Sequence, residues 1–545
     1  MCYEGRWAYN GSNPGAFDVD GWVMQQLSTP SQPRRLWLPV NSDAWYPIVI
    51  TGVALVSSFW RLGYEPLWFD EAWSIELSKR PVADTLAEYL WTNREGPPLY
   101  YTLLHFWMAL FGDSEVAARA LSALAGSAAV FFHFLFLRQF CSHGTTVLAS
   151  LLMATSPSLL HFAQEARNYS LTLMLFSLSL YLFLRFVADP APRNVVALSL
   201  INAIALLNHV FSVEVVFVQA VVISWLFRND RTLLKRWIIG NVLLAGILVP
   251  YLFLIPRAAV VAQWVPSPTL NSFLNLLGMA TGSSYFDNPS TARLHGIDLG
   301  SPDRVVMFIL FLGLSVCGGL VALKNLRTRD LQLKAGTSLA LLTPIVVTCL
   351  PLAIGYTVGG QIFIPRYLIM AIPHFLFLVA LGVSWLFSST VALTVVAIVT
   401  LALNVEKSGL EVKLVTKDDW RAAAALVSSQ LSFGDTVIVS DGRGIVPFEY
   451  YYAGSEKPVP IRGDFGFAES PREVERHLRS ITVPGGRLWL VMPWDGAVVD
   501  RRIGLWVYLE SREKAYPLLQ QRRIRGSWGG IRIHLYGLPP SDPTR

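Results

Sequence analysis

A succession of long apolar segments between residues 45 and 404 constrains the fold more than any other feature of the sequence. A helix needs about 20 mostly apolar residues to cross the hydrocarbon core of a bilayer. Only 15% of the residues are charged, whereas soluble domains carry about 25%. The pattern therefore predicts an α-helical polytopic membrane protein with about eleven transmembrane helices. The predicted spans are 45–60, 120–137, 145–162, 169–184, 195–207, 210–227, 237–255, 305–323, 337–356, 367–387 and 388–404.

Two segments determine the predicted number of spans and the side of the membrane on which each loop lies. Residues 97–112 are apolar but begin with Pro97-Pro98, which blocks a longer helix, so this segment is predicted to lie at the membrane surface. Residues 195–227 are divided at Asn208-His209, because this places the basic loop 228–236 in the cytoplasm. An odd number of spans then leaves the N-terminus inside and the C-terminus outside, although the first outer loop also contains several basic residues.

The chain divides into three parts. Residues 1–44 are predicted to form a cytoplasmic tail, and residues 45–405 a transmembrane domain with a first outer loop at 61–119. Residues 406–545 are predicted to form a soluble extracytoplasmic α/β domain, since helical spacing alternates there with short strand-like runs. The helix is expected at 418–431 and the strands at 435–441, 487–494 and 532–536.

Composition argues against several classes of protein. The net charge is +6, but the basic residues form no block, so a nucleic-acid surface is not expected. The cysteines do not form a C-x-x-C pair, which argues against a zinc site or a disulfide framework. No short apolar run follows a basic start, so no cleavable signal peptide is expected. The four cysteines are Cys2, Cys141, Cys317 and Cys349.

Charged and polar side chains collect on the predicted outer face. The stretch LWFDEAWS (67–74) places Asp70 and Glu71 side by side among aromatic residues. A buried ion costs several kcal/mol unless it is paired or reaches water, so several such residues at one depth indicate a shared polar cavity. The predicted outer-face residues are Asp70, Glu71, Arg94, Glu95, Glu165, Arg167, Tyr169, Asn208, His209, Glu214, Arg366 and Tyr367.

Each of these residues also has a purely structural interpretation. Asp70 and Glu71 could belong to a solvated loop, and Arg366 could extend its side chain to the interface. Glu165 and Arg167 could pair with each other or cap a helix end. His209 and Glu214 could make polar contacts between helices.

The charges suit one kind of chemistry. A carboxylate can accept the proton of an attacking hydroxyl group, and arginines can hold a phosphate and neutralise it as it leaves. Both features at a membrane surface favour a lipid-phosphate sugar donor, whose tail stays in the bilayer while its head group enters the site.

The sequence resembles membrane glycosyltransferases of the GT-C fold, in particular glycosyltransferase family 39, which includes protein O-mannosyltransferases and lipid A aminoarabinose transferases. The resemblance extends over roughly residues 45 to 405, and DDWRAAAALV (418–427) is similar to a segment of some bacterial relatives. The motifs that carry it are RLGYEPLWFDEAWS, GPPLYYTLLHFWMALFGDSEVAARALSALAG, SPSLLHFAQEARNYSL and IPRYLIMAIP.

The resemblance implies transfer of one sugar from a polyprenyl phosphate to an acceptor, with inversion at the anomeric carbon. The essential acidic residue of the family falls on Asp70, the expected general base, and Glu71 would orient it or contact the sugar. Relatives often have Lys or His where this chain has Gly96, a role that Arg94 could take over. The expected substrate-binding residues are Arg94, Glu95, Glu165, Arg167, Tyr169, His209, Arg366 and Tyr367.

Several questions stay open from the sequence. No cofactor is firmly implied, and a divalent cation is possible, although no D-x-D motif is present and a metal-independent reaction is preferred. The sugar is unidentified, and the acceptor could be a lipid, a glycan or a protein. The expected location is the cell (inner) membrane. Alternative functions are a transporter or flippase for an anionic lipid head group and a degenerate family member acting as a scaffold; no paired repeat typical of transporters is evident.

Overall fold

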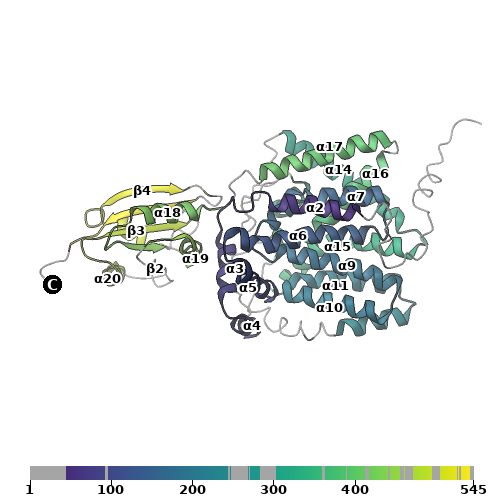
Figure 1. Ribbon diagram of the computed structural model, residues 1–545, viewed down its shortest axis with the longest axis horizontal. Coiled ribbons are helices and arrows are strands. Elements are labelled where there is room, and N and C mark those ends of the chain that lie inside the picture. The colour runs from purple at the N-terminus through teal and green to yellow at the C-terminus, as the bar shows by residue number, and fades with distance from the viewer. Residues whose placement is uncertain are drawn as a thin grey trace, which may run out of the picture.

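The computed structural model consists of a helical bundle followed by a mixed β-sheet (Figure 1). The described residues are 45–91, 96–242, 246, 268, 270–282, 302–358, 363–387, 390–411, 417–439, 442–454, 459–460, 471–493, 504–524, 526 and 530–540. The predicted tail, residues 1–44, and most of the predicted span 237–255 lie outside them.

The bundle is built from apolar helices packed around one large core. Its helices are α2 (Trp45–Phe59), α5 (Leu99–Phe111), α6 (Glu115–Leu137), α7 (His143–Ala154), α8 (Pro157–Ala163), α9 (Tyr169–Ala188), α10 (Pro192–Asn208), α11 (Val213–Leu226), α13 (Leu270–Thr281), α14 (Pro302–Asn325), α15 (Leu331–Val358), α16 (Ile372–Leu386) and α17 (Thr390–Glu411). Five helices are long and apolar enough to cross a membrane, and six if the bent pair α7–α8 is one span, among the residues that the structure describes. The larger count of about eleven remains a prediction.

The predicted span 145–162 consists of two helices, α7 and α8, because the chain bends by 55° between them. Pro157 begins α8, and the bend leaves the Leu152 carbonyl without its normal helical partner. The Asn404 side chain on α17 donates to this carbonyl at 2.8 Å and to the Thr155 hydroxyl at 2.8 Å. In contrast, the predicted division at Asn208-His209 is confirmed, since α10 ends at Asn208.

Two glycines allow α14 and α16 to pack closely. A Cβ atom at Gly318 would lie 1.9 Å from the Leu378 carbonyl oxygen, and one at Gly382 would lie 2.0 Å from that of Leu314. Neither position can therefore carry a side chain without separating the backbones. Small residues play this role where helices associate in membranes.

The C-terminal residues form a five-stranded sheet of order β2-β1-β3-β5-β4. Strand β1 runs parallel to β2 and β3, whereas β5 is antiparallel to β3 and β4. The predicted strands correspond to β1, β3 and β5, while β2 and β4 were not predicted. The strands are β1 (Thr436–Val439), β2 (Val459–Pro460), β3 (Arg487–Pro493), β4 (Leu518–Ile524) and β5 (Ile531–Gly537).

Helices cover both faces of this sheet. Trp489 and Val491 of β3 pack with α18 (Trp420–Gln430) and α19 (Gly442–Tyr451). The alternate residues Leu488 and Leu490 pack with α20 (Pro471–Ile481) and α21 (Gly504–Glu510). Successive side chains of a strand point to opposite faces, so one strand contributes to both cores.

Three helices of the first predicted outer loop lie at the end of the bundle that faces the sheet (Figure 1). They are α3 (Phe69–Lys79), α4 (Val82–Trp91) and α5. Helix α3 packs against both α5 and α19. This placement brings Asp70 and Glu71 to the junction between the bundle and the C-terminal residues.

Candidate functional site

Helix α3 carries the two adjacent acids in its first turn. Negative side chains stabilise this position because the unpaired N–H groups of a helix start carry partial positive charge. Glu71 also accepts from the Trp68 backbone N–H at 3.5 Å, which helps define where the helix begins. Because consecutive helical residues point in different directions, Asp70 and Glu71 enter different surroundings.

Asp70 lies between two arginines from distant parts of the chain. Arg366 Nη1, on the 3₁₀ helix η3 (Pro365–Ala371), is 3.2 Å from Asp70 Oδ2. Arg167 Nη2, in the turn between α8 and α9, is 3.8 Å from the same oxygen. The Asp70 side chain is 16% exposed and that of Arg366 only 6%. Asp70 is thus a partly accessible carboxylate held by two cations.

Aromatic rings surround the arginines. The Tyr367 ring centroid lies 5.5 Å from that of His209 and 6.4 Å from that of Tyr169. The Arg366 guanidinium carbon is 5.6 Å from the Tyr367 ring centroid and 5.8 Å from that of Trp68, distances at which a cation is attracted to a ring face. The guanidinium group of Arg366 is therefore held against aromatic rings.

Two buried N–H groups near these rings have no hydrogen-bond partner among the described residues. They are the indole Nε1 of Trp68 and the Nε of Arg167. Buried polar groups are usually paired, and one left unpaired costs free energy. Both groups are donors, so an oxygen-rich ligand would satisfy them.

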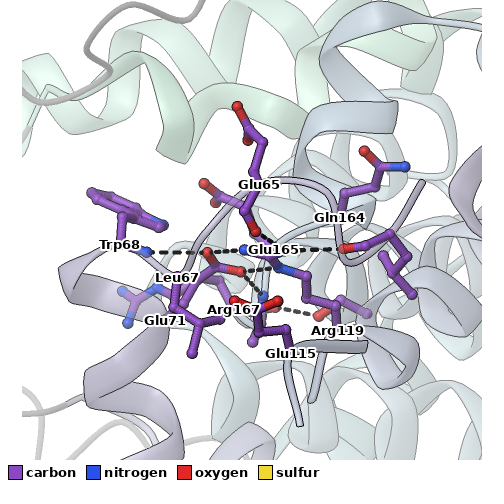
Figure 2. A network of polar contacts seen from close by, with 12 residues as sticks. Glu65, Leu67, Trp68, Glu71, Glu115, Arg119, Gln164, Glu165 and Arg167 are labelled. Atoms are coloured by element: carbon purple, nitrogen blue, oxygen red, sulfur yellow. Dashed lines mark hydrogen bonds and ion pairs between the residues drawn. The ribbon is translucent and has the colours of Figure 1, made fainter. Parts of the chain in front are cut away.

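Glu71 is fully buried and makes ion pairs on two sides (Figure 2). Arg119 of α6 donates from Nε to Oε1 at 2.7 Å and from Nη2 to Oε2 at 2.8 Å. Lys417 Nζ lies 2.9 Å from Oε2, and the Ala166 backbone N–H donates to Oε1 at 3.0 Å. Burial alone would raise the pKa of Glu71, but Arg119 and Lys417 hold this pKa well below its ordinary value of 4.5.

Arg119 also fixes the chain that leads into α3. Its remaining N–H groups donate to the backbone carbonyls of Leu62, Glu65 and Pro66, at 3.0, 2.8 and 3.1 Å. The guanidinium is 1% exposed. One side chain therefore ties a connecting loop, the first turn of α3 and α6 together.

Glu165 joins the same network from the turn before α9. Its Oε1 lies 3.4 Å from His161 Nε2 and 3.8 Å from Lys417 Nζ. Burial tends to raise the pKa of Glu165, but Lys417 and His161 lower it overall. A side-chain pair between Glu165 and Arg167 was one alternative, but Arg167 instead contacts Asp70.

The structure brings most of the sequence-predicted residues together. Glu71 is part of the network but faces away from the arginine pair, so its immediate contacts are structural. The solvated-loop alternative is wrong for Glu71, which has 0% exposure. Arg94 and Glu95 lie outside the described residues. The residues that contact one another in the site are Asp70, Glu71, Glu165, Arg167, Tyr169, His209, Arg366 and Tyr367.

Sequence reasoning missed four members of the site: Trp68, Arg119, His161 and Lys417. Arg119 is a charge near the start of an apolar helix, and that isolation was an available signal. Lys417 lies directly before the segment DDWRAAAALV (418–427), but nothing in that segment points to a contact with Glu71. Only the tertiary structure reveals its proximity to Glu71.

No group of three or more His, Cys, Asp or Glu side chains is arranged to hold a metal ion in the described part of the chain. The acids of the site are instead paired with Arg119, Lys417, Arg167 and Arg366. The donor set here is thus mostly cationic, which suits an anionic ligand better than a cation.

The chain is similar to known proteins in part of its sequence and in its fold. Residues 95–254 match the sequence model of the family described as dolichyl-phosphate-mannose-protein mannosyltransferase. The crystal structure of ArnT from Cupriavidus metallidurans in the apo state is similar, with 15% identity and a TM-score of 0.55 over 92% of this chain and 100% of that one. This is the GT-C glycosyltransferase fold. The predicted resemblance is therefore confirmed.

A second structure of ArnT, which contains a bound lipid phosphate, is also similar to this chain. It is ArnT from Cupriavidus metallidurans bound to undecaprenyl phosphate, with 14% identity and a TM-score of 0.53 over 92% of this chain and 100% of that one. No curated protein sequence matches the chain. The likeness to ArnT shows that the chain shares the GT-C fold, and the described residues include helices long and apolar enough to cross a membrane several times.

Proposed function

We propose that the protein transfers a sugar from a polyprenyl-phosphate donor to an acceptor hydroxyl group at the extracytoplasmic face of the cell membrane. The observation that carries the proposal is the Asp70 carboxylate between the partly exposed Arg167 and the buried Arg366. An acid beside two cations can serve a reaction in which a proton is taken up and a phosphate is released. The ArnT structure with undecaprenyl phosphate supports a lipid-linked donor for this fold.

The arginines bind the donor phosphate in this proposal. Without donor, Arg366 and Arg167 pair with Asp70. When the phosphate binds, its oxygens accept hydrogen bonds from the two guanidinium groups, including the free Arg167 Nε–H, and from the free N–H group of Trp68. Asp70 is then released to act on the acceptor.

The transfer step is a single displacement. The acceptor oxygen attacks the anomeric carbon of the sugar, and its proton passes to Asp70. The bond between the anomeric carbon and the phosphate oxygen breaks, and the electron pair stays on the phosphate, which Arg167 and Arg366 stabilise. Attack from the face opposite the leaving group inverts the anomeric carbon.

The other predicted residues have supporting roles. Glu71 orients Asp70 through the shared first turn of α3. Tyr169, His209 and Tyr367 form the wall beside the phosphate, and Glu165 positions the turn that carries Arg167. Arg94 and Glu95 are proposed to contact substrate as well.

The direct test uses purified protein in lipid nanodiscs with a panel of undecaprenyl-phosphate sugars labelled in the sugar. Candidate acceptors are a lipid, a glycan and a hydroxyl-bearing peptide. Label that moves to an acceptor while undecaprenyl phosphate is released supports the proposal. Binding of undecaprenyl phosphate without any transfer across the panel would favour a transporter or flippase instead.

Replacing Arg366 should weaken donor binding. An Arg366→Met variant loses charge-assisted hydrogen bonds worth about 1.5–3 kcal/mol, so affinity for undecaprenyl phosphate should fall about 10- to 100-fold. Native mass spectrometry or a thermal-shift titration measures this. The matched control is Arg193→Met, which removes an exposed arginine paired with Asp189 at 2.9 Å. Equal affinity in both variants would contradict the assignment of Arg366.

Transfer should not need a divalent cation, because two arginines already neutralise the leaving phosphate. The measurement is the initial rate after dialysis against EDTA, with Mg²⁺ or Mn²⁺ added back. We expect the same rate in all samples. Complete loss in EDTA that is restored by either metal would overturn this prediction.

A further inference from the structure

Lys417 reaches the site from the segment after the last helix of the bundle. Its ammonium group lies 2.9 Å from Glu71 Oε2, although the two residues are 346 positions apart. It also lies 3.8 Å from a carboxylate oxygen of Glu65 and 3.8 Å from one of Glu165. The side chain is only 6% exposed. One cation thus meets three acids from separate parts of the chain.

The charge balance of this network depends on Lys417. Three carboxylates, of Glu65, Glu71 and Glu165, are matched by the two cations Arg119 and Lys417, with His161 beside Glu165. Removing one partner of a buried ion pair leaves an uncompensated charge, which is costly because water cannot solvate it. Without Lys417, Glu71 would still pair with Arg119 and Glu165 with His161, but the described network would lose the one cation that contacts all three acids.

The network connects directly to Asp70. Glu71 follows Asp70 in the first turn of α3, and it also accepts from the backbone N–H of Ala166, the residue before Arg167. The position of Glu71 therefore affects both the direction of the Asp70 side chain and the position of the turn that carries Arg167. Among the described residues, Lys417 forms its ion pairs with Glu65, Glu71 and Glu165 and not with Asp70.

The C-terminal residues that follow Lys417 also contact the chain just before α3 and just before α6. Arg421 of α18 pairs with Glu115, and the Tyr451 hydroxyl accepts from the Leu67 backbone N–H at 2.7 Å. The Tyr450 hydroxyl donates to the Asp113 carbonyl at 2.9 Å. These contacts hold the segment that delivers Lys417 at a fixed distance from α3.

We infer that Lys417 is a positioning residue for the transfer reaction, which makes the C-terminal segment a working part of the site. Its ammonium group holds Glu71 and thereby keeps Asp70 aimed at the acceptor hydroxyl. The inference rests on the proposed function for its kinetic consequences. Its structural consequence, that Lys417 keeps α3 ordered, is independent of that function.

The kinetic test compares Lys417→Met with Lys417→Arg in nanodiscs. Lys417→Met should lower kcat about 10- to 100-fold, since a misplacement of about 1 Å costs about 100-fold in rate. The KM for the donor should change by less than about twofold, because Arg167 and Arg366 still bind the phosphate. Lys417→Arg retains the charge and should recover most of the rate. Lys79→Met, which removes an exposed lysine of α3 paired with Asp113 at 2.8 Å, is the control and should match the wild type.

Three results would overturn the inference. The first is an unchanged kcat in Lys417→Met. The second is a rise in donor KM at constant kcat, which would make Lys417 a donor ligand. The third is an equal loss in Lys417→Arg, which would mean that shape and not charge matters.

A readout without activity separates this inference from the proposed function. Hydrogen exchange of the backbone amides in residues 65–79 should speed up at least about tenfold in Lys417→Met, while the amides of α9 stay protected. If Lys417→Met does not fold, the double variant Glu71→Gln/Lys417→Met removes both charges and keeps the comparison. Failure of every donor in the panel would refute the proposed function alone, whereas unchanged exchange in 65–79 would refute the positioning role.

Discussion

An Asp70→Asn variant should bind undecaprenyl phosphate and yet transfer sugar about 10²- to 10⁴-fold more slowly than the wild type, the usual cost of losing a general base. Asparagine has nearly the same shape as aspartate, so the side chain still fits beside Arg366 and Arg167. It cannot accept the proton of the acceptor hydroxyl. Because the two arginines lose a competing negative charge, donor binding should be retained. Initial rates and a binding titration on the same preparation measure both effects.

The control for Asp70→Asn is Asp84→Asn, which changes an exposed aspartate on the neighbouring helix α4. That variant should transfer sugar at the wild-type rate. A folded Asp70→Asn protein with wild-type activity would rule out Asp70 as the base. Loss of donor binding together with activity would instead place Asp70 in phosphate recognition.

An Arg119→Met variant should be the most destabilising single change in the site. Arg119 donates five hydrogen bonds, two to the Glu71 carboxylate and three to backbone carbonyls. Breaking a buried ion pair from one side costs about 3–5 kcal/mol. Since the lowered pKa keeps Glu71 ionised, its pairing stabilises the fold above pH 4.5, and this stabilisation is lost only as the pH falls through the lowered value. The free energy of unfolding in detergent, measured with urea, reports the loss.

A second variant separates the ion pair from simple packing. Arg119→Met/Glu71→Gln removes both charges, so it should be less destabilised than Arg119→Met alone. Arg193→Met should change the free energy of unfolding by no more than about 1 kcal/mol, because its ion pair is exposed. If Arg119→Met were as stable as Arg193→Met, the buried network would not hold the loop.

The sequence predicted the fold where the pattern depends on local hydrophobicity. Apolar length marked α6, α9 and α16, a β-branched run marked β1, and a short apolar run marked β3. The bend between α7 and α8 was missed because the apolar residues on the two sides of Thr155 and Ser156 are together long enough for one span, while the compensating amide comes from Asn404 far along the chain. Strand β4 was missed because its side chains are mostly exposed and polar, so it lacks the apolar alternation of a half-buried strand.

The residues of the site were also predictable only where the local sequence marked them. Charges next to aromatic residues or at the ends of apolar segments were recognisable as costly, which identified Asp70, Glu165, Arg167 and Arg366. The division of labour between the two adjacent acids was not predictable. It depends on which cations the folded chain brings to each, and Lys417 comes from outside every recognisable motif.

The long separation between Glu71 and Lys417 also orders events during synthesis. A ribosome adds about 5–20 residues per second, so helix α3 leaves it roughly 20–70 s before the lysine that completes its surroundings. The nascent chain therefore spends that interval in the bilayer with its acids incompletely neutralised. A protein truncated before residue 417 would lack this cation, so its transfer rate should fall at least as far as that of Lys417→Met.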